Sequence, residues 1–116
     1  MAAQFLFNLL LKYRKRSALS QEDVAFLLGV RSGAKVCRYE RFLREPGLQT
    51  ALAFEVIFAC PISELFPGLF AKAQKEVRAR ARKLEKKGFR GSSTRLIARK
   101  RQVLSAVASG ELNKHK

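Results

Sequence analysis

The run SQEDVAFLLG, residues 20–29, contains both a signal that starts a helix and a signal that ends it. Ser20 is followed three positions later by Asp23, and these side chains can satisfy the free N–H groups of the first helical turn from both ends. Gly29 adopts at little cost the left-handed conformation that ends a helix. Ser32 is a second capping residue, placed just before another helical pattern at 33–40. The sequence therefore predicts two very short helices joined by a tight turn, short enough to cross steeply.

The rest of the chain also has a helical pattern. Apolar residues recur at helical spacing, and no segment of useful length alternates with the period of two that a strand needs. Stretches containing Pro or Gly mark breaks at 44–47, 67–68 and 88–93. The further helices are expected at about 4–16, 50–58, 64–66 with Ser63 as its cap, 69–87 and 94–109. The expected fold class is all-α, with a helical domain at 1–69 and a basic helical extension at 70–116.

The charge of the chain is large and unevenly distributed. Its 24 Lys and Arg residues exceed its 9 acidic residues by 15, and its pI is near 10.8. Residues 1–71 carry a net charge of +3 and residues 72–116 a net charge of +12. A compact protein rarely carries such self-repulsion unless a polyanion offsets it, so nucleic acid is the leading partner and an anionic membrane surface the second. We expect the segment 72–116 to contact DNA phosphates, because neutralising several phosphates releases counterions.

Several classes of protein are disfavoured. Cys37 and Cys60 stand alone and the single histidine is His115, so we expect no metal site and no cofactor. No paired carboxylates or nucleophile–base arrangement indicates an enzyme. The apolar N-terminal run precedes its cations, unlike a signal peptide, and is too short to span a membrane. An amphipathic membrane-surface helix at 70–87 ranks low, because its apolar stripe lacks Trp. We expect a cytoplasmic, nucleoid-associated protein.

The short-helix pair and the segments after it resemble the phage-repressor-type (Cro/repressor, XRE) family of DNA-binding domains. The motifs that carry the resemblance, in order, are LSQEDVAFLLGV, RYE followed by REP, and PISELFPG. The match covers about residues 10–69, more than half of the chain. The resemblance implies a five-helix, lambda-repressor-like helix-turn-helix domain that usually binds operator DNA as a dimer.

The resemblance also implies roles for individual residues. Gln21 matches a glutamine that holds a DNA phosphate, and Arg14 and Glu40 match an ion pair that ties the first helix to the recognition helix. Ala34 and Arg38 match base-facing positions, as does Gly33, which permits close approach. An arginine such as Arg38 can bond guanine with two hydrogen bonds, worth roughly 1–3 kcal/mol of base discrimination. Lys35, Arg41 and Arg44 would face phosphates. The full set of expected DNA-binding residues is Gln21, Arg31, Ser32, Gly33, Ala34, Lys35, Arg38, Arg41 and Arg44.

Two features depart from the family pattern. The run RSGAK, residues 31–35, is one residue longer than the common turn, which leaves open which of Gly33, Ala34 and Lys35 face bases. Phe42 stands where the family often has a glycine that closes the recognition helix. Because a residue with a side chain avoids the left-handed conformation, we expect the helix to run on, or Phe42 to act as an anchor against a partner.

The first predicted helix is apolar on several sides. Phe5, Phe7, Leu9 and Leu11 cannot all face one core, so another element must cover some of them. The candidates are the apolar side of 94–109 and a second subunit. We favour a homodimer, because palindromic operators mirror a two-fold protein.

Two functions compete. The leading hypothesis is a sequence-specific DNA-binding transcription regulator, either a small repressor or activator or an autoregulating antitoxin. The segment after 69 is too short and too basic to hold a ligand pocket, so control would come from the protein's own concentration, a regulatory protein partner or proteolysis. The alternative is an architectural or RNA-binding protein with little sequence preference, in which Phe89 and Arg90 stack on unpaired bases.

Overall fold

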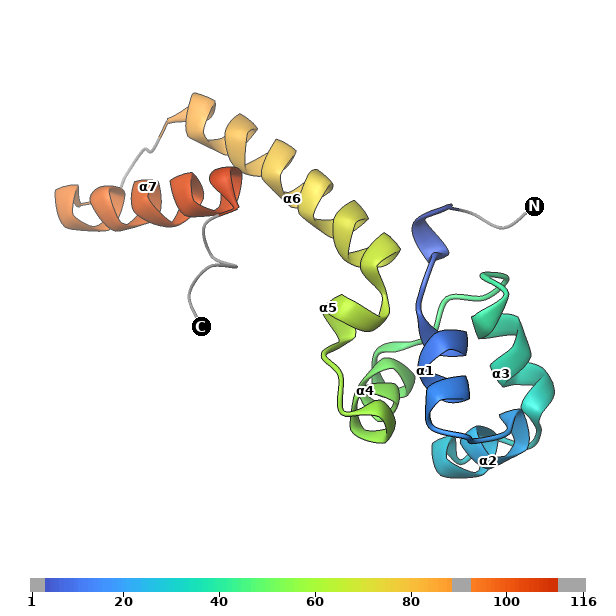
Figure 1. The fold of residues 1–116 in the computed structure, drawn as a ribbon. Helices are drawn as coiled ribbons and strands as arrows, with labels where there is room; N and C mark the ends of the chain where they lie inside the picture. The colour runs from blue at the N-terminus through green and yellow to red at the C-terminus, as the bar shows by residue number, and fades with distance from the viewer. Residues whose placement is uncertain (1–3, 89–92, 111–116) are drawn as a thin grey trace. The chain divides into compact units, whose positions relative to one another are not determined.

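The computed structural model describes residues 4–88 and 93–110, and no strand occurs among them. The predicted all-α class is therefore confirmed (Figure 1). The elements in chain order are the short 3-10 helix η1 (Gln4–Leu6), α1 (Leu10–Arg16), α2 (Gln21–Leu28), α3 (Gly33–Glu40), α4 (Leu48–Phe58), α5 (Ile62–Leu65), α6 (Pro67–Lys87) and α7 (Thr94–Ser109). The contacts within the chain divide it into an N-terminal unit, Met1–Ala71, and a C-terminal unit, Lys72–Lys116.

Helix α2 has the caps that its sequence predicts. The hydroxyl of Ser20 accepts a hydrogen bond from the backbone N–H of Asp23 at 2.9 Å. In return, the carboxylate of Asp23 accepts one from the backbone N–H of Ser20, also at 2.9 Å. These hydrogen bonds lower the pKa of Asp23, since they favour its charged form. Gly29 ends the helix with a φ of +77°, so local side chains limit α2 at both ends.

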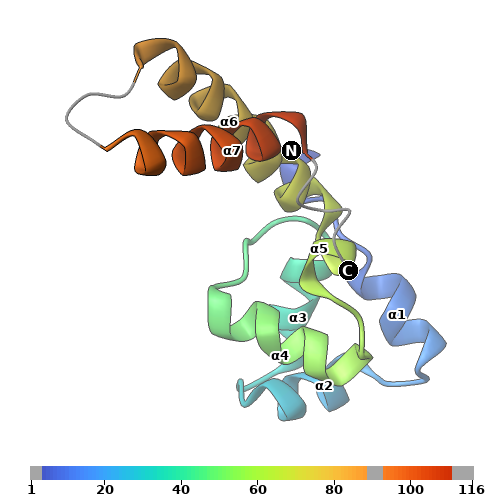
Figure 2. The same ribbon diagram turned by 90° about the vertical axis from the view of Figure 1, so that its left-hand side faces the viewer.

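The core of the N-terminal unit is built around an aromatic cluster. The ring of Phe54 in α4 lies 5.9 Å from that of Tyr39 in α3 and 6.0 Å from that of Phe66, measured between ring centroids. Helices α1 to α5 surround this centre (Figures 1 and 2). The buried apolar residues of the cluster are Leu10, Val24, Ala25, Val36, Tyr39, Phe54, Cys60, Leu65 and Phe66. The helical spacing in the sequence predicts that Val24 and Leu27 of α2 and Val36 and Tyr39 of α3 face inward. Val24, Val36 and Tyr39 are buried, but the prediction is wrong for Leu27, which is 54% exposed.

The N-terminal segment is not the continuous helix that periodicity predicts at 4–16. It breaks between η1 and α1, because the groups at the break bond to other parts of the molecule. The backbone N–H of Leu9 donates to the carbonyl of Leu65 at 2.9 Å. The side chain of Asn8 accepts a hydrogen bond from the N–H of Leu10, the first residue of α1, at 3.0 Å. A helix through this point would leave the carbonyl of Leu65 without this donor.

Four apolar residues at the N-terminus were expected to need a cover. Leu9 is half-buried, and Phe7 packs against the ring of Phe42 at 5.5 Å between centroids. Phe5, Phe7 and Leu11 still expose 37%, 45% and 43% of their surface. The N-terminal unit by itself therefore covers these residues only in part.

The other helix boundaries move by one or two residues. Helix α4 begins at Leu48 rather than at Thr50. Helix α5 begins at Ile62 rather than at Glu64, so Ser63 lies inside the helix and does not cap it. Helix α6 begins at Pro67, within the break that is expected at 67–68. Proline suits the first position of a helix, because its fixed φ is already helical and its missing N–H is not needed there.

The C-terminal unit contains most of α6 and all of α7. Ser93 begins α7, since its hydroxyl accepts from the N–H of Leu96 at 3.3 Å. The end of α7 lies against the middle of α6, where the guanidinium of Arg82 donates to the carbonyl of Ala108 at 3.3 Å (Figure 2). Most of the predicted break at 88–93, including Phe89 and Arg90, and the tail with His115 lie outside the described residues. Among the described helices, none has the length and apolar character that crossing a membrane requires.

Candidate nucleic-acid interface

A concave surface lies at the turn between α2 and α3. We call it the α3 surface, and it encloses about 430 Å³. Its lining residues are Gly29, Val30, Arg31, Ser32, Ala34, Lys35 and Arg38. Five of these were expected DNA-binding residues, three are cations, and none is acidic. The structure thus brings together Arg31, Ser32, Ala34, Lys35 and Arg38 on one surface.

The periodicity of α3 explains this grouping. Val36 and Tyr39 are 1% and 3% exposed, and they hold one side of the helix against the core. Arg38 therefore projects away from the core and is exposed, whereas Lys35 lies at the edge of the buried face and is half-buried. Ser32 begins the helix, because its hydroxyl accepts from the backbone N–H of Ala34 at 3.3 Å.

The structure places Gly33 differently from the base-facing position that the family resemblance implies. It is buried against α2, and its backbone N–H donates to the carboxylate of Glu22 at 2.9 Å. A Cβ at this position would lie 2.8 Å from that carboxylate oxygen and 2.9 Å from the Cβ of Gln21. Gly33 therefore allows α3 to pack closely on α2, and Glu22 places a negative charge at the positive end of α3.

This packing makes a specific prediction for Gly33→Ala. Helix propensity alone favours alanine by about 1 kcal/mol, but overpacking against α2 costs about 1–3 kcal/mol. We expect a net loss in the free energy of unfolding, measured by urea denaturation. Gly47→Ala is the matched control, because Gly47 has a φ of −70° and a Cβ added there would have no neighbour within 4 Å. Greater stability for Gly33→Ala than for the unchanged protein would contradict the close packing.

Arg14 and Glu40 form the ion pair that the family resemblance implies. The guanidinium of Arg14 makes two hydrogen bonds to the carboxylate of Glu40, the longer of 3.1 Å. The pair is largely buried, with 13% of the Arg14 side chain and 3% of the Glu40 side chain exposed. Glu40 also raises the pKa of Arg14, because these hydrogen bonds favour the charged guanidinium. A third hydrogen bond joins Arg14 to the carbonyl of Leu19 at 3.0 Å, so α1, the start of α2 and α3 are tied together.

Gln21 also bonds to this pair. Its side-chain amide donates to Glu40 at 3.0 Å, and the residue is half-buried. The expected role of Gln21 was to hold a DNA phosphate. In the structure its amide nitrogen instead donates to the carboxylate of Glu40, the last residue of α3. Glu40 thus accepts hydrogen bonds from both Arg14 and Gln21.

The expectation that Phe42 avoids the left-handed conformation is wrong. This residue adopts a φ of +63°, the left-handed conformation that a side chain was expected to avoid. The conformation costs about 1–2 kcal/mol. Two contacts oppose that cost: the N–H of Leu43 reaches the carbonyl of Arg38 at 2.9 Å, and the ring of Phe7 covers Phe42. Helix α3 therefore does not continue through Phe42. The ring that packs against Phe42 belongs to Phe7 of the same chain and not to a partner. Arg41 and Arg44 lie exposed on either side.

Asn8 is a structural residue that is not among those expected from the sequence. It is 6% exposed, and its amide donates to the carbonyl of Tyr39 at 2.9 Å. It thereby connects the N-terminal segment to the last turn of α3. The one available signal was a single polar residue within the apolar run FLFNLLL, which indicates a buried hydrogen bond only when the partner is known.

The C-terminal unit carries most of the positive charge. Its described residues include twelve cations and two acids, Glu76 and Glu85. The cations are Lys72, Lys75, Arg78, Arg80, Arg82, Lys83, Lys86, Lys87, Arg95, Arg99, Lys100 and Arg101. All of them are exposed except Arg78, which is half-buried. Glu76 pairs with Lys72 at 2.8 Å, and this exposed pair lowers the pKa of Glu76.

The described residues contain no group of three or more His, Cys, Asp or Glu side chains that could hold a metal ion. Cys37 is half-buried on α3, Cys60 is buried in the core, and both are free thiols. No protein-family model, curated protein or solved structure matches the chain. The function is therefore argued from the residues and their geometry.

Proposed function

We propose that the protein is a sequence-specific regulator of transcription that binds double-stranded DNA with α2 and α3 as a helix-turn-helix. The observation that carries the proposal is the α3 surface: a concave site with three cations and no acid, on a helix whose other side is buried. Affinity for a polyanion needs such charge, and entry into the major groove needs one exposed helix face.

The proposed docking gives each residue a role. The start of α3 enters the major groove, where Arg38 reads a base and Ala34 contacts a thymine methyl group. Lys35 and Arg31 contact phosphates, and Arg41 and Arg44 continue the phosphate contacts beyond the helix. Phosphate contacts give affinity and orientation without sequence information, so base discrimination depends mainly on Arg38.

The basic C-terminal unit adds affinity in this proposal. Its exposed cations on α6 and α7 neutralise further phosphates and release counterions. The affinity should therefore fall steeply as salt rises. We also propose that the protein acts as a homodimer in the cytoplasm, at the nucleoid. The partly exposed Phe7 and Leu11 and the symmetry of palindromic sites support the dimer. The regulator is a small repressor, activator or autoregulating antitoxin.

A second candidate function is supported by the charge distribution. The C-terminal unit has a net charge of +12, against +3 for residues 1–71. An architectural or RNA-binding protein would use that charge without base readout and would bind all duplexes with similar affinity. A regulator should instead prefer its operator over random duplex by about 10³-fold or more. Selection of bound sequences from a random duplex pool, followed by affinity measurement, separates the two functions.

Arg38→Ala provides the direct test of base readout. Loss of a bidentate arginine–guanine contact should cost about 1–3 kcal/mol at one base position in each half-site. The measurement is the affinity for the selected site and for its single-base variants. Arg99→Ala is the matched control, since Arg99 is an exposed arginine of α7 that should weaken binding to every sequence alike. Uniform weakening by Arg38→Ala would place Arg38 on the DNA backbone, and failure to bind any duplex at moderate salt would refute the proposed function.

A further inference from the structure

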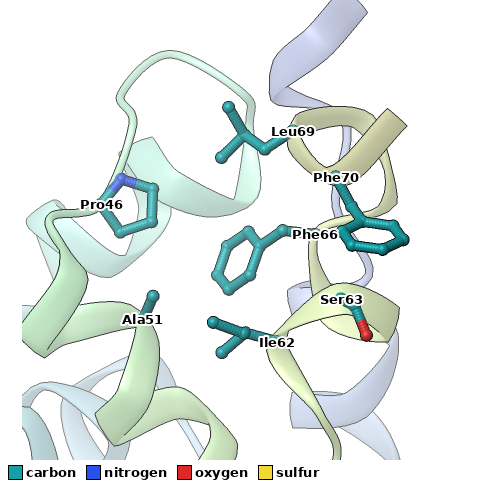
Figure 3. Close-up of a pocket in the computed structure, with 7 residues that line it drawn as sticks. All are labelled: Pro46, Ala51, Ile62, Ser63, Phe66, Leu69 and Phe70. Carbon is teal, nitrogen blue, oxygen red and sulfur yellow. The ribbon is translucent and has the colours of Figure 1, made fainter. Parts of the chain in front are cut away.

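An apolar pocket of about 300 Å³ opens in the N-terminal unit, apart from the α3 surface (Figure 3). Its walls come from the segment before α4, from α4 itself, from α5 and from the first turn of α6. Pro46 and Ala51 lie on one side of the pocket, and Ile62, Phe66 and Leu69 lie on the other. None of these residues belongs to the α3 surface, so the pocket is a separate feature.

The chemistry of the lining restricts what the pocket can bind. Although the chain has 24 Lys and Arg residues and 9 acidic residues, no charged side chain lines the pocket. Ser63 supplies the one hydroxyl group of the lining. A charged ligand would lose its hydration here without gaining an ionic partner, which is costly. The lining therefore favours a neutral, apolar molecule with at most one hydrogen-bonding group.

The core and backbone hydrogen bonds hold the walls of the pocket in place. Phe66, which is 4% exposed, lies 6.0 Å from Phe54 between ring centroids and thus belongs to the core. Its backbone N–H donates to the carbonyl of Ile62 at 2.9 Å, and the N–H of Phe70 donates to the carbonyl of Phe66 at 3.0 Å. Because these groups are already held in place, little conformational entropy has to be lost on binding.

We propose that this pocket binds a neutral aromatic or branched aliphatic small molecule. Its volume is at the lower end of the range of about 300–1,000 Å³ that is typical of small-molecule sites. A second copy of the chain is the alternative occupant, and the oligomeric state of the protein distinguishes it from a small molecule. A small molecule bound in this pocket would be a further means of controlling the protein, besides its own concentration, a protein partner and proteolysis.

The position of the pocket connects it to the candidate nucleic-acid interface. Pro46 is buried in the pocket wall, two residues after Arg44, and both lie in the segment that joins α3 to α4. A ligand that contacts Pro46 restricts this segment and so changes the freedom of Arg44 to reach a phosphate. This coupling rests on the proposed function, whereas ligand binding itself does not.

The test uses the neutral fluorescent probe N-phenyl-1-naphthylamine, whose emission rises in apolar surroundings. Titration of the full chain should show one saturable site. Ala51→Leu fills the pocket and should weaken probe binding at least about tenfold, the effect of lost contact and overpacking together. Gln49→Leu introduces the same side chain on an exposed position of α4 and should leave the affinity unchanged. If circular dichroism shows that Ala51→Leu does not fold, Ser63→Leu narrows the pocket from another wall and carries the same expectation.

Absence of saturable binding, or an unchanged affinity in the pocket-filling variant, would overturn the proposal. So would a dimer in sedimentation experiments that Ala51→Leu dissociates, since a second copy would then be the occupant. A change in duplex affinity on adding the probe supports the coupling, and an unchanged affinity refutes the coupling alone. If no duplex binds at all, the proposed function fails while the probe titration still decides the pocket.

Discussion

Replacement of Glu40 by alanine should lower the free energy of unfolding by about 3 kcal/mol. Breaking a buried ion pair costs about 3–5 kcal/mol, because one charge is left without its partner. We expect the lower end, since 13% of the Arg14 side chain remains in contact with water. Glu40 also accepts from Gln21, so the variant leaves two donors at the junction of α1, α2 and α3 without their acceptor. Urea denaturation at fixed pH measures the change.

Two controls test whether that loss of stability comes from the buried ion pair. Glu76→Ala removes an ion pair with Lys72 whose side chains are 43% and 44% exposed, and it should have no clear effect on stability. The double variant Arg14→Leu with Glu40→Leu removes both charges. It should be more stable than Glu40→Ala, because no unpaired charge remains in the interior. The single variants Arg14→Leu and Glu40→Leu complete the comparison. If the double variant lost as much stability as these two single variants added together, the two residues would not act as a pair.

Replacement of Phe54 by alanine should cost about 3–5 kcal/mol, the range for a large aromatic residue in a closed core. Phe54 is 1% exposed, and its ring contacts those of Tyr39, Phe58 and Phe66. These partners come from α3, from α4 and from the residue between α5 and α6, so no single neighbour can move in to fill the cavity. A loss of this size is a large part of the 5–15 kcal/mol that typically holds a domain together.

Phe26→Ala is the matched control for this variant, since it deletes the same side chain from a residue that is 83% exposed. Its effect on stability should be within about 0.5 kcal/mol, as for other surface substitutions. Thermal and urea unfolding of both variants provide the comparison. Similar losses for Phe54→Ala and Phe26→Ala would mean either that the aromatic cluster is not the centre of the core or that Phe26 is covered in solution.

The elements that the sequence predicts best are those with local determinants. Ser20, Asp23 and Gly29 start and stop α2 through hydrogen bonds that span three or four positions in the chain. Val36 and Tyr39 face inward because their helix places them three residues apart on one side. Such features follow from chain geometry before any tertiary contact forms, which is why pattern and capping rules identify them.

The departures involve partners that are distant in the sequence. The break in the N-terminal helix depends on Asn8 and on Leu65, and Asn8 bonds to Tyr39 across 31 positions. The close packing at Gly33 depends on Glu22, 11 positions earlier. Phe42 adopts a left-handed conformation against its local preference, with Phe7 packed on its ring. The spacing of residues in the sequence does not indicate which of these distant residues come into contact.

The sequence by itself determined the all-α class, the start and stop of α2, the start of α3, and the burial of Val24, Val36 and Tyr39. Six of the nine expected DNA-binding residues lie within 31–38, and five of these six line the α3 surface. Only the tertiary structure decided that Gly33 packs on α2, that Gln21 bonds to Glu40 and that an apolar pocket lies beside α4. The physical reason is that caps and helix faces depend on neighbours within a turn or two, whereas pockets and buried hydrogen bonds depend on which distant segments meet.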